Sequence, residues 1–133
     1  MAGWSKDVGA ITLFVEDLGC AKSFYQDIFE LTPVYEDENS ALFKFGNTMI
    51  DLLKVSEAPG LISPGIVGQR DAGSRFQLSI FVHDVDAVCN ELTGRGVELL
   101  NGPMNSEWGM RTAAFVDPDG HIWEVAQDLS EGS

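Results

Sequence analysis

The chain has 133 residues, 44% of them hydrophobic, which is the size and apolar content expected of a single domain spanning residues 1–133. Its 8 Lys and Arg residues against 21 Asp and Glu residues give a net charge of −13, which would repel phosphate backbones and anionic membrane surfaces. We therefore expect neither nucleic acid nor a membrane as a partner. The charge favours either solubility or the attraction of a cationic ligand, and composition does not separate the two.

The two cysteines, Cys20 and Cys89, lack CxxC spacing and are too few for a disulfide scaffold, which favours a reducing compartment. The first residues show no basic segment followed by an apolar core and a cleavage site, and no apolar run is long enough to span a bilayer. These features predict a cytoplasmic protein. Both cysteines fall on predicted helices without a histidine at a recognisable spacing, which favours core positions over nucleophiles.

The first half of the chain predicts a strand, a helix and a hairpin. Residues 10–15, AITLFV, form a strand candidate, and Asp17 stands where an N-cap would open a helix. The apolar residues of that helix recur on one face: Ala21, Phe24, Tyr25 and Ile28. Residues 41–55 then contain two strand-like runs joined by Gly46 and Asn47, a pair suited to a tight hairpin turn.

The same order returns in the second half. The strand candidate at residues 76–82 leads to an N-cap candidate, Asp84, and then to an apolar helical face. That face consists of Val85, Val88, Cys89 and Leu92. A final hairpin follows, with an Asp-Pro-Asp-Gly turn at residues 117–120. The chain therefore divides into modules at residues 8–55 and 75–128, joined by a linker at residues 56–74 that is rich in Gly, Pro and Ser.

Two segments carry a family resemblance: FVEDLGCAKSFYQDIF at residues 14–29 and WGMRTAAFVDPDGHIWEVAQ at residues 108–127. Together with the repeated order of elements, they resemble the vicinal oxygen chelate superfamily of glyoxalases, extradiol dioxygenases and bleomycin-resistance proteins. The stretch WGMR is similar to the bleomycin-resistance branch in particular. The resemblance implies an α+β fold in which two βαβββ modules curl their sheets into a cup around a binding cavity.

One residue departs from the family pattern. The family usually ends its first helix with Gly, as this chain does at Gly96 in the second half, but the matching residue of the first half is Glu30. A strained or rebuilt turn is expected there.

Strand alternation predicts which side chains would line the cup. In the first module they are Ala10, Thr12, Phe14, Met49, Asp51 and Leu53, and in the second they are Gln77, Ser79, Phe81, Ile122, Glu124 and Ala126. Trp123 has the opposite parity and is expected to pack beneath the helices. Glu124 therefore points inward, although its neighbours in the sequence are apolar.

In metal-using members of the resembled family, two such positions from each module hold a divalent ion. The matching residues here are Ala10, Asp51, Gln77 and Glu124, so one position has no donor atom and none is a histidine. The histidines are His83, expected as a solvated strand-end residue, and His121, expected to hydrogen-bond within its turn. We therefore expect no metal cofactor. The alternative is Mg²⁺ or Mn²⁺ held by three oxygen ligands, Asp51, Gln77 and Glu124.

Aromatic and soft apolar residues gather near the predicted cup: Phe14, Phe43, Phe45, Met49, Trp108 and Met110. Phe43 and Phe45 fit the core as well as the cup, because sequence does not fix their strand parity. Trp108 lies in the polar stretch NSEWGMR, where a large aromatic side chain favours contact with a ligand or a partner chain.

The leading interpretation is a metal-independent binding protein of the bleomycin-resistance type, which gives antibiotic resistance by sequestration. Its ligand would be a small aromatic compound with a cationic group. The predicted ligand-binding residues are Thr12, Phe14, Met49, Asp51, Gln77, Ser79, Trp108, Met110 and Glu124. The alternatives are a metal-dependent lyase or isomerase of the glyoxalase type and a scaffold that has lost the site. Open sheet edges also predict a homodimer.

Overall fold

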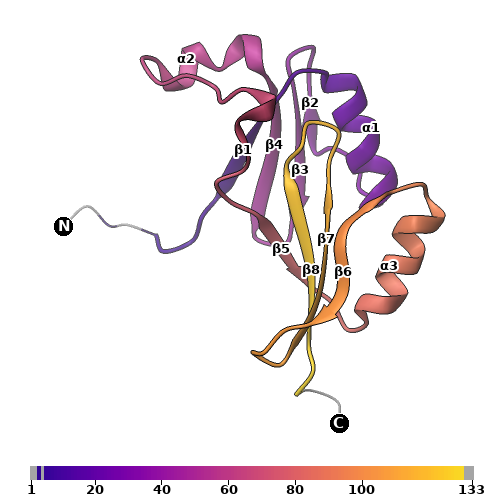
Figure 1. The fold of residues 1–133 in the computed structure, drawn as a ribbon. Coiled ribbons are helices and arrows are strands. Elements are labelled where there is room, and N and C mark those ends of the chain that lie inside the picture. Colours follow the sequence, from indigo (N-terminus) through magenta and orange to yellow (C-terminus); the bar gives the residue numbers. More distant parts are fainter. Residues whose placement is uncertain (1–2, 4, 131–133) are drawn as a thin grey trace. The chain divides into compact units, whose positions relative to one another are not determined.

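The structure, a computed structural model, describes residue 3 and residues 5–130, and its chain forms two compact units, Met1–Gln69 and Arg70–Ser133. Each unit follows the order of one strand, one helix and three strands (Figure 1). The predicted α+β class with two βαβββ modules is therefore confirmed. Within the described ranges, no helix is long and apolar enough to cross a membrane.

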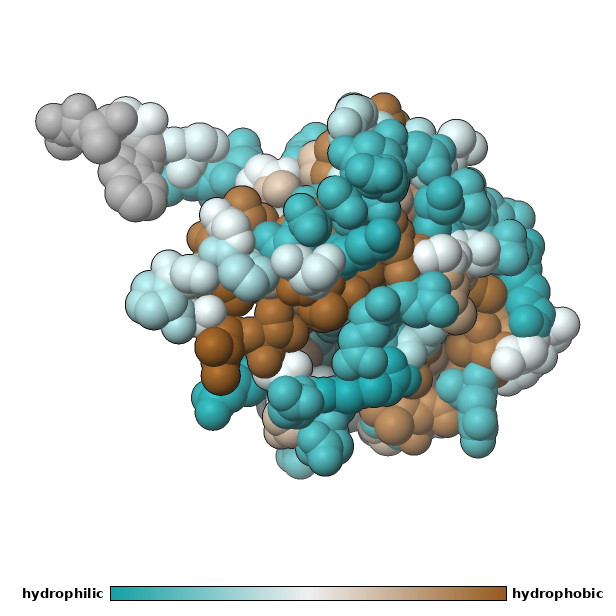
Figure 2. Space-filling model, turned by 90° about the horizontal axis from the view of Figure 1, so that it is seen from above, coloured by the Kyte–Doolittle hydropathy of each residue, from teal (hydrophilic) through white to brown (hydrophobic). Residues whose placement is uncertain are grey.

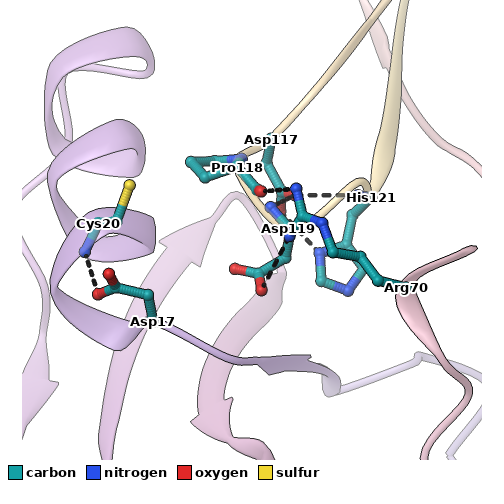
Figure 3. A network of polar contacts seen from close by, with 7 residues as sticks. All are labelled: Asp17, Cys20, Arg70, Asp117, Pro118, Asp119 and His121. Carbon is teal, nitrogen blue, oxygen red and sulfur yellow. Dashed lines mark hydrogen bonds and ion pairs between the residues drawn. The ribbon is translucent and has the colours of Figure 1, made fainter.

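The first unit is a four-stranded sheet with one long helix. Its elements are β1 (Ala10–Val15), α1 (Leu18–Ile28), β2 (Tyr35–Glu36), β3 (Ser40–Phe45) and β4 (Thr48–Lys54). The strand order is β1-β4-β3-β2, with β1 parallel to β4 and the other neighbours antiparallel. As predicted, Asp17 caps α1, because its carboxylate accepts a hydrogen bond from the Cys20 backbone N–H at 3.0 Å (Figure 3). Gly46 forms the β3–β4 turn with a φ of 59°.

The core of the first unit lies between α1 and one face of this sheet. The ring of Tyr25 on α1 lies 5.8 Å from that of Phe43, and Phe29 meets Phe45 edge to face at 5.1 Å, both measured between ring centroids. Phe43 and Phe45 therefore belong to the helix-covered face and not to the opposite one. The fully buried members of this core are Leu13, Val15, Ala21, Tyr25, Ala41, Phe43, Ile50 and Leu52.

The predicted linker contains short helices. After β4 come η1 (Val55–Glu57), α2 (Pro59–Ile62) and η2 (Arg70–Ala72), with Ala58 fully buried between the first two. Most other residues of the segment are exposed, as expected for a connection that runs over the surface.

The second unit repeats the topology. Its elements are β5 (Leu78–Phe81), α3 (Val85–Gly94), β6 (Leu99–Asn105), β7 (Met110–Val116) and β8 (Ile122–Asp128), in the strand order β5-β8-β7-β6. Asp84 caps α3 by accepting from the Ala87 N–H at 3.1 Å, as predicted. The strand β5 is shorter than the predicted 76–82, so Gln77 lies just before it.

Contacts with α3 show which face of the second sheet is covered. The Gln127 side chain on β8 accepts a hydrogen bond from the Val85 N–H at 2.9 Å, and Arg111 on β7 forms hydrogen bonds and an ion pair with Asp86 on α3. Trp123 shares the parity of Gln127 and is 3% exposed. The prediction that Trp123 packs beneath the helix is confirmed, and Glu124 lies on the opposite, open face.

Two local expectations have different outcomes. Glu30 has a φ of 54° and Gly96 a φ of 85°, so Glu30 occupies the left-handed region that a glycine would adopt without strain. The predicted strained turn is confirmed. Cys89 is buried, but Cys20 is exposed. The predicted core position of Cys20 is wrong, because this residue lies in the first turn of α1 on the solvent side.

Strand β6 is irregular. Its pairing with β7 shifts between Leu99 and Asn101 and again between Asn101 and Met104. Gly102 lies within the second shift with a φ of 82°, and a Cβ placed on it would lie 2.5 Å from the Thr112 carbonyl oxygen and 2.8 Å from the Ala113 Cα. The backbones of β6 and β7 therefore approach too closely there for any other residue.

Gly102→Ala is expected to lower the free energy of unfolding by about 2–4 kcal/mol, because it adds both left-handed strain and a backbone clash. Gly94→Ala serves as the control: Gly94 is the last residue of α3 with open space around it, and alanine there should be neutral or stabilise by up to about 1 kcal/mol. Chemical denaturation of both variants measures the difference. Equal stabilities would contradict the proposed close approach.

Candidate functional site

The open face of the second sheet has a polar row across all four strands. The strand register aligns Ser79 on β5 with Glu124 on β8, Glu124 with Ala114 on β7, and Ala114 with Asn101 on β6. The next row is mostly apolar and contains Phe81, Ala126, Thr112 and Met104. Because directly paired residues point to the same side of a sheet, these side chains share one surface.

Glu124 is held in place on this surface. The Ser79 hydroxyl donates a hydrogen bond to Glu124 Oε1 at 2.8 Å, and the Glu124 side chain is half-buried. An ionised carboxylate can accept about four hydrogen bonds, so this contact leaves Glu124 with capacity for a ligand. All residues of β5–β8 are described, and none of those on this face is Lys, Arg or His; the one cation of these strands, Arg111, lies on the helix-covered face.

The open face of the first sheet also carries a carboxylate. Asp51 on β4 pairs with Thr12 on β1 and Leu42 on β3, and Phe14 and Met49 lie on the same face. Burial raises the pKa of Asp51 above its ordinary value, and the negative charge of Asp37 raises it further. The structure thus brings together the predicted site residues Thr12, Phe14, Met49 and Asp51 within this unit.

The remaining predicted ligand-binding residues differ from one another in location and exposure. Met110 on β7 pairs with Asp128 and shares the open face of the second sheet, half-buried. Gln77 is exposed and precedes β5. Trp108 lies in the β6–β7 turn and is 88% exposed. That turn is well defined, because the Ser106 hydroxyl oxygen accepts from the backbone N–H groups of Trp108 and Met110, both at 3.3 Å.

Exposed apolar side chains accompany these polar groups. Phe81 is 75% exposed, Met104 48% and Val116 38%, all on strands of the second sheet. On the side of the molecule seen in Figure 2, hydrophobic patches interrupt a largely hydrophilic surface. A solvated surface with so many apolar groups is typical of a region that contacts a ligand or another protein.

The β7–β8 turn contains a second polar network, which holds the turn together. Asp117 is buried and accepts from the backbone N–H groups of Asp119 and His121 at 2.9 Å, and its other oxygen lies 2.8 Å from His121 Nδ1 (Figure 3). Arg70 joins from η2, where its guanidinium donates to the Pro118 carbonyl and lies 3.7 Å from Asp119 Oδ1. The prediction that His121 bonds within its turn is confirmed.

The donor groups at the four positions that the family resemblance implied do not fit a typical transition-metal site. Ala10 offers no side-chain donor, Gln77 offers a neutral amide, and within the second unit Glu124 is the one carboxylate among the matching positions. No group of three or more His, Cys, Asp or Glu that could hold a metal ion occurs in residue 3 and residues 5–130. Divalent transition metals in proteins usually have His or Cys ligands, and this set provides none.

Sequence reasoning did not place Asn101, Met104 or Thr112 on the open face. Simple alternation from Leu99 places Asn101 on the helix side, and the register shift in β6 moves it to the side of Glu124. Gly102 and Pro103 within a strand were the available signal, since this pair commonly marks a bulge.

Asp51→Asn is expected to raise the melting temperature at pH 7. The raised pKa means that the folded state binds the Asp51 proton more tightly than the unfolded chain, so this group lowers stability as pH rises from the unfolded pKa through the folded one. The gain should shrink at pH 3, where both states are protonated. Thermal unfolding at the two pH values measures it, with the exposed Asp71→Asn as the control for net charge. An equal effect at both pH values would contradict the assignment.

Comparisons with known proteins agree with this fold. The family model "Glyoxalase/Bleomycin resistance protein/Dioxygenase superfamily" matches residues 7–125. The chain is 36% identical over 126 residues to the uncharacterized protein YraH of Bacillus subtilis (strain 168), covering 90% of this chain and 96% of YraH. It is 29% identical over 119 residues to the metallothiol transferase FosB of Shouchella clausii (strain KSM-K16), covering 89% of this chain and 77% of FosB.

Solved structures are similar in fold at lower sequence identity. A glyoxalase/bleomycin resistance protein/dioxygenase from Nocardioides aligns with a TM-score of 0.84 and 20% identity, over 98% of this chain and 87% of that one. Lactoylglutathione lyase from Agrobacterium tumefaciens aligns with a TM-score of 0.75 and 20% identity, over 97% and 98%. The repeated βαβββ topology, the two open sheet faces and the match over residues 7–125 lead to one conclusion: the chain belongs to the glyoxalase/bleomycin resistance protein/dioxygenase superfamily.

Proposed function

We propose that this chain is a metal-independent small-molecule-binding protein that sequesters an aromatic, cationic compound, in the manner of the bleomycin-resistance type. The observation that carries the proposal is Glu124, a half-buried carboxylate that is fixed by Ser79 on an open sheet face without a cation of its own. Sequestration requires binding alone, so no catalytic residue is assigned.

The charge of Glu124 favours a cationic ligand. A carboxylate that a ligand covers is costly unless the ligand supplies a compensating charge and hydrogen bonds. An ammonium group would supply both, and charge-assisted hydrogen bonds of this kind are the strong ones. Asp51 on the first sheet also favours a cationic ligand, because its raised pKa shows that its surroundings already disfavour the charged form.

The exposed aromatic side chains of the protein favour a ligand that contains an aromatic ring. Trp108 is presented on a defined turn with 88% of its surface exposed, and Phe14 lies on the same open face as Asp51. Aromatic faces attract both flat apolar rings and cations. Trp108 is therefore proposed to contact an aromatic part of the ligand that extends along β7 to the β6–β7 turn, while Glu124 contacts the charge of the ligand.

The relatives favour no single chemistry. FosB is named as a metallothiol transferase, and a metal-dependent reaction in this chain would need ligands that Ala10 and Gln77 do not provide in the usual form. The alternative of a metal-dependent lyase or isomerase therefore depends on metal uptake by Asp51, Gln77 and Glu124, which can be measured directly.

The first test uses benzylamine as the cationic aromatic probe and benzyl alcohol as its neutral analogue, titrated by protein NMR. Glu124→Gln is expected to weaken benzylamine binding by about 1–3 kcal/mol, the range for losing a charge-assisted hydrogen bond, and to leave benzyl alcohol unaffected. Glu98→Gln removes the same charge at an exposed position before β6 and is the control. Benzylamine binding that is equal in both variants would contradict the proposal.

Trp108→Ala should weaken cationic and neutral aromatic ligands alike when these are long enough to reach the β6–β7 turn from Glu124, because the ring contact does not depend on charge. Calorimetric titration of the purified protein with Mg²⁺, Mn²⁺, Ni²⁺ and Zn²⁺ tests the metal-free half of the proposal. Stoichiometric uptake of any of these ions that Glu124→Gln abolishes would overturn it in favour of the enzyme.

We further propose that the protein is a homodimer. Strands β1, β2, β5 and β6 each end a sheet within their own unit, and unpaired strand edges are commonly covered by another chain. Sedimentation velocity at micromolar concentration should show a dimer, and a monomer as the sole species would contradict this.

A further inference from the structure

The irregularity of β6 has a specific effect on the open face of the second sheet. Leu99 pairs with Phe115, which is buried on the helix-covered side, and two residues later regular alternation would place Asn101 on that side as well. The register shift instead pairs Asn101 with Ala114, the partner of Glu124. Bulges often redirect a side chain beside a functional site.

Asn101 and Glu124 stand two strands apart in one row. The residue between them, Ala114, has only a methyl group, so no long side chain of β7 separates the two polar groups. Two strand spacings put their Cα atoms about 10 Å apart. Below the row, Ala126 is a second small residue, and Phe81 and Met104 stand at either end of that lower row, exposed.

This arrangement sets a chemical requirement. Glu124 accepts hydrogen bonds, whereas the carboxamide of Asn101 both donates and accepts. Ala114 and Ala126 are only 5% and 3% exposed, so a ligand ring would lie above the sheet, between the projecting side chains of Glu124 and Asn101, and would point one end to each polar group. A neutral group that is complementary to an amide would satisfy Asn101, which is exposed and forms no hydrogen bond that competes on this face within the described part of the chain.

We propose that Asn101 is a specificity-determining residue that binds a neutral carbonyl, amide or hydroxyl group of the ligand, at the end of the ring opposite the cation held by Glu124. This inference rests on the proposed function, because it takes the cation at Glu124 as given. The ligand class is thereby narrowed to elongated aromatic amines that carry a hydrogen-bonding group at the far end of the ring.

The test compares three probes of one scaffold: 4-(aminomethyl)benzamide has both end groups, benzylamine has the amine alone, and benzamide has the amide alone. In the wild-type protein, NMR titration should show that 4-(aminomethyl)benzamide binds about fivefold more tightly than benzylamine, as one added hydrogen bond implies. Asn101→Ala should abolish this advantage and leave benzylamine affinity unchanged. Glu124→Gln should weaken both amines.

Asn105→Ala is the matched control, because Asn105 lies on the same strand but pairs with Arg111 on the helix-covered face. It should keep the fivefold advantage, and thermal unfolding checks that each variant is folded. An advantage that survives Asn101→Ala, or that the wild-type protein lacks, overturns the role of Asn101, while the effect of Glu124→Gln on benzylamine still supports the proposed function. Benzylamine binding that is absent, or insensitive to Glu124→Gln, overturns both.

Discussion

The packing of a single helix against one face of each sheet is the constraint on which the rest of the structure depends. The Tyr25 ring on α1 packs at a tilt against Phe43, and the Val85 N–H of α3 donates a hydrogen bond to the Gln127 side chain. Burial of one face supplies the hydrophobic stabilisation of each unit, and that face is therefore largely apolar. The other face is free of this requirement, which is why carboxylates such as Asp51 and Glu124 are tolerated there.

This division explains why one strand can carry residues of opposite character. Trp123 and Glu124 are adjacent in β8, but they face different surroundings, and each is suited to its own side. Ser79 has the same relation to its neighbours in β5. The open face is therefore assembled from every second residue, and its composition is nearly independent of the core. A family with this topology can change its ligands without rebuilding its interior.

Much of the fold was predictable because its signals are local. Asp17 and Asp84 open helices, Gly46 closes a hairpin, and strand parity places Trp123 and Glu124 correctly. The sequence did not show which face of the sheet Phe43 and Phe45 occupy. Alternation along a strand separates two faces, but it does not show which of them the helix covers.

The side of the sheet on which Asn101 lies was not predictable for a related reason. Its side depends on where β6 slips against β7, which is a property of two strands and not of either sequence alone. Cys20 was misplaced because a first-turn residue of a helix can face solvent even when its neighbours are apolar.

The connection between the two units has a practical consequence for protein engineering. At one end Ala58 is fully buried, and at the other Arg70 is held by the carbonyl of Pro118 and the carboxylate of Asp119. Between these two fixed points, Ile66 is 89% exposed, and its neighbours Gly65 and Gly68 are exposed as well. Lengthening a surface loop between anchored ends costs little entropy. A fluorescent reporter or an affinity tag inserted beside Ile66 would lie outside every strand of both sheets.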